Sequence, residues 1–154
     1  MKTKILLGLA VVFLALQAIR PAKNLSATAP FTGKDDITAL YPPSPDVCQI
    51  LAASCYDCHS NQTRYPWYAE VQPVAWWLAS HIRDAKRELN FAEFGAYPHK
   101  RQMKKLESLV DEVRDRTMPL KSYTFIHRDA KLTDGQIAAL ASWAEAAEDQ
   151  LAKE

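Results

Sequence analysis

Hydrophobic and polar positions follow a helical period over most of the chain after residue 45. In four segments the apolar residues recur three and four positions apart, which is the spacing of one face of an α-helix. The pattern predicts helices over residues 46–58, 74–89 and 100–116 and from Thr133 onwards. No segment alternates strictly as a half-buried strand does. We therefore expect an all-α domain of about four helices over residues 46–151.

Local signals support the predicted helix ends. Pro45 and Asp46 suit the start of the first helix, and Pro73 precedes the second. Thr133 and Gln136 have the three-residue spacing of a capping box. The apolar positions expected to face the core are Val74, Trp77, Leu78, Ile82 and Ala85 in the second helix and Met103, Leu106, Leu109, Val110 and Val113 in the third.

The first 22 residues have a different pattern, with Lys2 and Lys4 before an uncharged apolar run over residues 5–19. This is the form of an export signal. A full membrane span needs about 20 apolar residues, and this run is shorter. The small residues that a signal peptidase needs are poorly placed, however, which argues against cleavage. We therefore expect residues 1–22 to be an uncleaved anchor in the bacterial inner membrane. A removed signal peptide, which would leave a soluble periplasmic protein, is the alternative.

Residues 23–45 contain Pro30, Pro42, Pro43 and Pro45 and show no apolar period. Such a segment is typical of a tether between a membrane and a folded domain. The positively charged end of a signal stays in the cytoplasm, so the domain itself is expected in the periplasm.

The composition narrows the possible functions. The chain has 154 residues, 48% of them hydrophobic, and a formal net charge of +1. No strong positive field is present to attract nucleic acid. The count of four glycines is low for a fold rich in tight turns, and three cysteines make a poor disulfide scaffold.

The chemistry is concentrated in the segment Cys55-Tyr56-Asp57-Cys58-His59. Two cysteines separated by two residues and followed by histidine form the attachment signature of c-type haem. On a helical turn, residues three apart share one face, so two thiols can bond to one edge of a porphyrin while His59 lies under its iron. The motif predicts one covalently attached haem c, with His59 as the proximal iron ligand.

Three other readings of the motif have less support. A zinc site needs four ligands and usually a second paired motif, which the sequence lacks. A thioredoxin-like redox pair belongs in a βαβ setting. The third alternative is an ordinary structural disulfide between the two cysteines.

Met118 is the expected sixth ligand of the iron. It precedes Pro119, which disfavours a helical conformation and places it in a loop after the third helix. Met103 lies on an apolar helix stripe and is expected in the core instead. His81 is the rival ligand, on the apolar side of the second helix, because imidazole also binds haem iron. His99 and His127 are expected in loops.

The sequence resembles the bacterial haem-binding domain family of small exported c-type cytochromes. The likeness covers about residues 46–145 and is carried by SCYDCHSNQTRYPWY, PVAWWLASHI, LNFAEF and MPLKSYTFIHRDAKLTDGQIAALASWA. The resemblance implies a cytochrome c-like helical domain with one covalent haem on Cys55, Cys58 and His59, and Met118 in the Met-Pro position that many cytochromes c use.

We therefore expect a membrane-anchored monohaem cytochrome that transfers electrons to redox partner proteins and is not an enzyme. One alternative is a peroxidase-like enzyme, which would require an open sixth position on the iron. The other is a haem-based sensor of redox state or of small gas molecules. Cys48 lies outside the motif and is expected to be a buried thiol, or else a redox-active one. The basic run Lys100, Arg101, Lys104 and Lys105 could attract an acidic partner.

Overall fold

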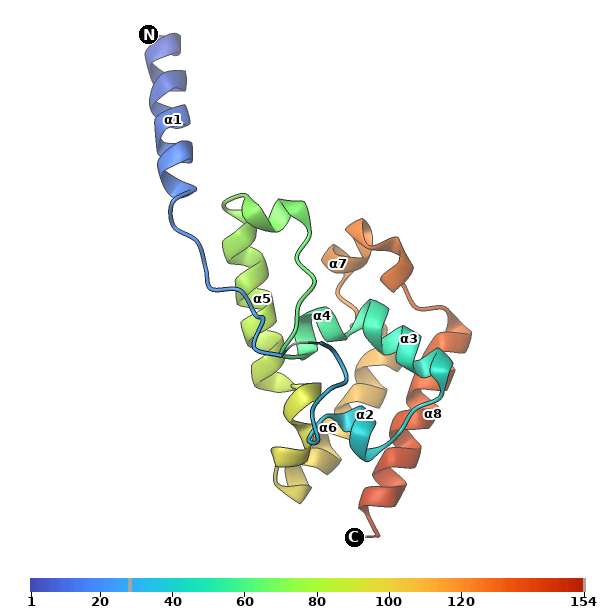
Figure 1. The fold of residues 1–154 in the computed structure, drawn as a ribbon. Coiled ribbons are helices and arrows are strands. Elements are labelled where there is room, and N and C mark those ends of the chain that lie inside the picture. The colour runs from blue at the N-terminus through green and yellow to red at the C-terminus, as the bar shows by residue number, and fades with distance from the viewer. Residues whose placement is uncertain (28, 154) are drawn as a thin grey trace.

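The computed structural model describes residues 1–27 and 29–153 of the chain, and within them the fold is helical without a β-strand. An isolated antiparallel bridge joins Leu25 to Gln62. Figure 1 shows one helix projecting away from a bundle formed by the others. In chain order the helices are α1 (Lys2–Leu16), α2 (Ile37–Leu40), α3 (Pro45–Ser54), α4 (Tyr56–His59), η1 (Trp67–Glu70), α5 (Val74–Glu88), η2 (Phe91–Ala96), α6 (His99–Arg114), α7 (Lys121–Ile126), η3 (Arg128–Ala130) and α8 (Asp134–Leu151).

The all-helical fold class is confirmed, and the long helices α3, α5, α6 and α8 begin close to where the sequence predicts them. The first predicted helix is divided, because α3 ends at Ser54 and a new turn, α4, begins at Tyr56. At the start of α8 the predicted capping box is present. The Gln136 amide donates to the Thr133 hydroxyl at 3.3 Å, and the Thr133 amide donates to the Gln136 side chain at 2.9 Å.

The core lies mainly between α6 and α8, which pack together more extensively than any other pair of described elements. Leu106 of α6 and Leu140 of α8 are fully buried, and Met103 packs against the same cluster. Close packing of this kind fixes the separation of two helices. The third predicted helix therefore faces the core as expected, and Met103 has the core position assigned to it.

The predicted buried face of α5 is only partly correct, because Ile82 is buried as expected but Val74 and Trp77 are not. Val74 and Trp77 are 36% and 47% exposed, and the buried residues of α5 are Ala75 and Ile82. The neighbouring Trp76 is partly buried, and its indole N–H donates to the Ile19 carbonyl at 3.0 Å, a tertiary contact that the helical period does not predict.

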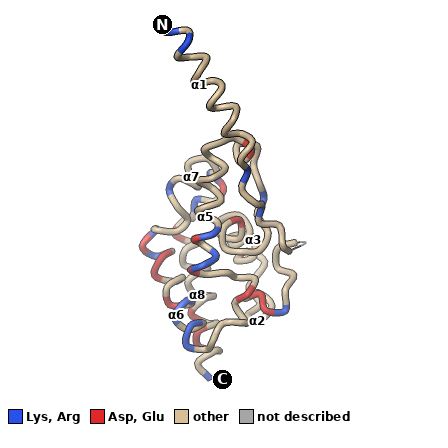
Figure 2. Tube along the Cα trace, turned by 90° about the vertical axis from the view of Figure 1, so that its left-hand side faces the viewer, with Lys and Arg blue, Asp and Glu red and all other residues tan. Residues whose placement is uncertain are grey.

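Helix α1 extends from the domain and carries no charge after its first residues (Figures 1 and 2). It is 15 residues long, and none of them is buried. In the described part of the chain, no helix is both long enough and apolar enough to cross a bilayer. The expected membrane-spanning helix is therefore not found, because the apolar run provides too few helical residues.

The segment expected to be a tether is attached to the domain along much of its length. Asn24 bonds through its backbone N–H to the Tyr65 hydroxyl at 2.7 Å and through its side chain to the Ser60 carbonyl at 2.8 Å. Further along, Asp36 caps the short helix α2, and Ile37 is fully buried. The sequence analysis did not expect this helix, because four residues are too few to show a period.

Candidate functional site

The motif Cys55–His59 forms a single helical turn between α3 and α5. The amides of Cys58 and His59 both donate to the Cys55 carbonyl, at 3.2 and 3.0 Å. Helix α4 packs against α3, α5 and η2, so the turn is surrounded by the domain. The two thiols and the imidazole therefore belong to one fixed local structure.

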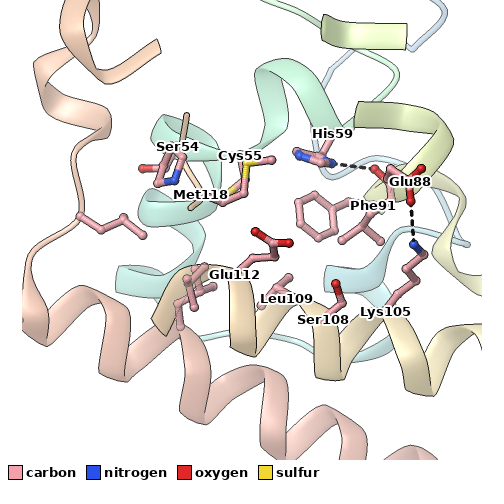
Figure 3. Close-up of a pocket in the computed structure, with 15 residues that line it drawn as sticks. Ser54, Cys55, His59, Glu88, Phe91, Lys105, Ser108, Leu109, Glu112 and Met118 are labelled. Carbon is pink, nitrogen blue, oxygen red and sulfur yellow. Dashed lines mark hydrogen bonds and ion pairs between the residues drawn. The ribbon is translucent and has the colours of Figure 1, made fainter. Parts of the chain in front are cut away.

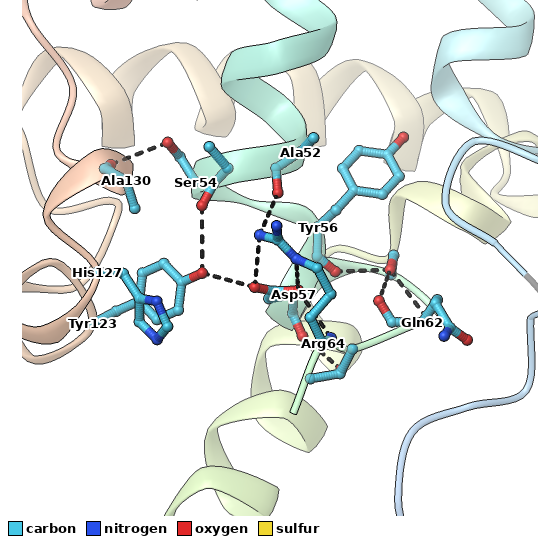
Figure 4. Close-up of polar contacts among 12 residues, drawn as sticks. Ala52, Ser54, Tyr56, Asp57, Gln62, Arg64, Tyr123, His127 and Ala130 are labelled. Atoms are coloured by element: carbon cyan, nitrogen blue, oxygen red, sulfur yellow. Dashed lines mark hydrogen bonds and ion pairs between the residues drawn. The ribbon is translucent and has the colours of Figure 1, made fainter. Parts of the chain in front are cut away.

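The two residues between the cysteines hold this turn in place. The Tyr56 hydroxyl donates to Asp36 at 2.7 Å, which connects the turn to α2. The Asp57 carboxylate accepts from the Arg64 guanidinium at 3.1 Å and from the Tyr123 hydroxyl at 2.8 Å (Figure 4). Tyr56 thus bonds the turn to the residue that caps α2, and Asp57 bonds it to Arg64 and to α7.

His59 is oriented by a backbone carbonyl. Its Nδ1 donates to the Leu89 carbonyl at 2.8 Å, and its other ring nitrogen is turned to the side of the pocket where Cys55 lies (Figure 3). Burial lowers the pKa of His59, which favours the neutral imidazole. A metal-binding histidine usually donates its second ring N–H to a carbonyl or carboxylate in this way. His59 is therefore prepared to bind a metal through Nε2.

A pocket of about 170 Å³ opens beside Cys55 and His59. It is smaller than the about 300–1,000 Å³ of typical small-molecule sites, so its lining, and not its volume, indicates the kind of ligand. Most of the wall is apolar, formed by Leu89, Phe91, Leu109, Val113, Met118, Pro119, Leu132 and Leu140. The polar lining residues are Ser54, Glu88, Lys105, Ser108 and Glu112, with Lys105 and Glu88 paired at 3.3 Å.

The thiols of the motif are free and protonated at neutral pH. Burial raises the pKa of Cys55 to about 12 and that of Cys58 to about 11, and in Cys58 the nearby Asp57 charge adds to the effect. Redox-active cysteines have a lowered pKa. The surroundings of these two thiols therefore do not favour thiol–disulfide exchange.

The structure brings Met118 together with Cys55 and His59 in the lining of this pocket. Cys58 belongs to the same turn as these residues but is not part of the pocket lining. His81 is also absent from the lining. Its Nδ1 lies 2.9 Å from the Trp77 carbonyl, and its ring packs on the partly exposed Trp77 ring, so its predicted buried setting is wrong.

The other singled-out residues lie away from the motif. Cys48 is a partly exposed free thiol in α3. His99 starts α6, where its ring lies 3.0 Å from the Leu151 carbonyl, and His127 ends α7, where its Nε2 lies 2.6 Å from the Tyr68 hydroxyl. No group of acidic, cysteine and histidine side chains in the described chain could hold a separate metal ion.

The residues present fit a haem. Haem is flat and largely apolar, and it needs an apolar cavity together with a ligand for its iron. The pocket provides the apolar wall, and His59 provides a neutral imidazole whose Nδ1 is already bonded. The fold and site thus define a small helical protein that binds a metal-containing organic cofactor.

A comparison with family models agrees with this description. The model of the haem-binding domain family matches residues 11–146. The chain therefore belongs to the haem-binding domain family, and haem is its cofactor. No curated protein and no solved structure matches the chain.

Sequence reasoning missed several residues of the site. Phe91 lies on the pocket wall, with its ring 5.8 Å from that of His59 and 5.2 Å from that of Tyr56. The Leu89 carbonyl that orients His59 was missed as well. Both residues lie in the stretch LNFAEF, which is one of the stretches that carry the family resemblance. Nothing in the residue types of this stretch indicates that it lies beside Cys55–His59 in the fold.

Proposed function

We propose that this domain is a monohaem c-type cytochrome that transfers electrons. Cys55 and Cys58 would hold the haem through thioether bonds, and His59 would bind the iron through Nε2. The orientation of His59 by the Leu89 carbonyl, at the wall of an apolar pocket, is the observation that carries the proposal. The free thiols on the same turn support covalent attachment.

Met118 is the proposed sixth ligand. It lines the same pocket as His59, and its thioether is a soft ligand that favours Fe(II) and raises the reduction potential. Its backbone N–H donates to the Glu112 carbonyl at 3.2 Å, which ties the residue to the end of α6. With His59 and Met118 both bound to it, the iron would have no open position for a substrate.

These features support electron transfer as the function of the domain. When bound, haem supplies an iron that gains or loses one electron. The chain's own part is to exclude water through the apolar wall, to keep His59 neutral and oriented, and to hold Met118 in place. None of these residues needs to move a proton or bind a substrate.

We also propose that the protein acts outside the bacterial cytoplasm, with redox proteins as its partners. Residues 1–22 have the form of an export signal, and haem c is attached after export. The basic residues Lys100, Arg101 and Lys104 border a groove that shares Lys105, Ser108 and Glu112 with the haem pocket. An acidic partner that binds there would approach the pocket.

Visible spectra and redox titrations test this function. The full chain would be produced in a bacterium that matures cytochromes c, as wild type, Met118→Ala and His81→Ala. We expect a methionine–iron charge-transfer band in the oxidised wild type and its loss, with a lower potential, in Met118→Ala. His81→Ala, as the matched control, should behave as wild type.

Other outcomes would change the assignment. If His81→Ala lowers the reduction potential and Met118→Ala does not, the assignment of Met118 as the sixth ligand is wrong. A high-spin wild type that reacts rapidly with peroxide would indicate an enzyme. Reversible binding of a gas without turnover would indicate a sensor.

A further inference from the structure

Helix α7 has little apolar packing to hold it in place. Phe125 and Ile126 are 81% and 55% exposed, and no residue of α7 is buried. Among the described elements, its only extensive backbone neighbour is η3, the turn that follows it. Met118 is separated from α7 only by Pro119 and Leu120. The position of Met118 therefore depends on the contacts, other than apolar packing, that hold α7 in place.

Two side chains, Tyr123 in α7 and His127 directly after it, form polar contacts with the rest of the domain. The Tyr123 hydroxyl donates to the Asp57 carboxylate at 2.8 Å and also lies 3.3 Å from the Ala53 carbonyl (Figure 4). The His127 ring lies 2.6 Å from the Tyr68 hydroxyl and stacks on the Tyr123 ring, with centroids 4.4 Å apart. Of the two, only the Tyr123 contact reaches the cysteine–histidine motif.

The acceptor of the Tyr123 bond is itself fixed. Three donors of Arg64, its backbone N–H, Nε and Nη2, lie 3.0 to 3.1 Å from the Asp57 carboxylate, whose side chain is 10% exposed. Asp57 stands between the two motif cysteines, so it moves with the turn that carries His59. Hydrogen bonds to a charged acceptor are stronger than those between neutral groups.

The other end of the Met118 loop is also held. The backbone amides of Thr117 and Met118 donate to the Glu112 carbonyl at 3.1 and 3.2 Å. The loop is thus fixed at the end of α6 and again at Tyr123, with Met118 between the two points.

We propose that Tyr123 is a positioning residue that keeps Met118 in the haem pocket by bonding α7 to Asp57 of the haem-attachment turn. This inference rests on the proposed function, in which Met118 is the sixth ligand. Without the Tyr123 hydroxyl, the segment between Thr117 and Ile126 would open more often, and Met118 would then leave room in the pocket for an added ligand.

The test replaces Tyr123 by Phe in the haem-loaded full chain. Tyr65→Phe is the matched control, because its hydroxyl also forms a hydrogen bond, at 2.7 Å from the Asn24 amide, but does not touch α7. Imidazole binding to the oxidised protein, the reduction potential and amide hydrogen exchange over residues 117–126 would be measured. We expect Tyr123→Phe to keep its haem, to bind imidazole about tenfold faster, to exchange faster in this segment and to have a lower potential.

Asp57→Asn provides a second variant. It keeps an acceptor for Tyr123 but loses the charge, so the increase in imidazole binding should be smaller than in Tyr123→Phe. If the wild type shows the methionine–iron band and Tyr123→Phe matches Tyr65→Phe in every measurement, the positioning role is refuted while the proposed function stands. A wild type without the band refutes the Met118 ligand and, with it, the role of Tyr123.

Discussion

Replacement of Phe91 by Ala should destabilise the domain and disturb His59 together, because one ring serves both the core and the pocket. Phe91 is 2% exposed, and its ring packs on those of Tyr56 and His59. Removing a buried phenylalanine ring costs about 3–5 kcal/mol of the free energy of unfolding. Because two ring contacts are lost as well, we expect about 4 kcal/mol.

Urea unfolding of the haem-loaded protein, followed by circular dichroism, measures this cost. Phe125→Ala is the matched control, since its ring is 81% exposed and its loss should change the free energy of unfolding by less than about 0.5 kcal/mol. The visible spectrum of Phe91→Ala should also shift, as the His59 ring loses a neighbour. If the two variants differ by less than about 1 kcal/mol, Phe91 does not have the core role that its burial implies.

Two further predictions concern α8 and the motif thiols. Thr133→Ala should lower the free energy of unfolding by about 1 kcal/mol because it removes the capping box, whereas Thr133→Asp should lower it by less than half of that; equal losses in urea unfolding would contradict the capping role. In protein made without haem, Cys55 and Cys58 should react slowly with iodoacetamide at neutral pH and faster as the pH rises towards their pKa values of about 12 and 11, because only the thiolate reacts. Rapid alkylation at neutral pH, read by peptide mass, would contradict the raised pKa values of these thiols.

The sequence predicted the elements that local patterns specify. The apolar stripe of α6 and the capping box at Thr133 were correct, because each depends on residues close together in the chain. The buried face of α5 was correct at Ile82 but not at Val74 or Trp77, since tertiary contacts such as the bond from Trp76 to Ile19, 57 residues away, are not visible in a local pattern. Short helices such as α2 also leave no periodic signal.

The candidate site was predictable only in part. Its reactive side chains stand together in Cys55–His59, so the motif alone indicated haem. The orientation of His59 could not be predicted, because its partner is the backbone carbonyl of Leu89. Every residue has such a carbonyl, so the residue type gives no signal. The bond from Tyr123 to Asp57 joins residues 66 positions apart and had no local signal either.

Covalent haem attachment is the central claim, and the intact mass of the purified, denatured protein tests it most directly. Wild type from a cytochrome-maturing host should carry the mass of one haem after acid–acetone extraction, and the Cys55→Ala/Cys58→Ala double variant should not. A wild-type chain that loses all of its haem to the extraction, or a double variant that retains it, would contradict the account.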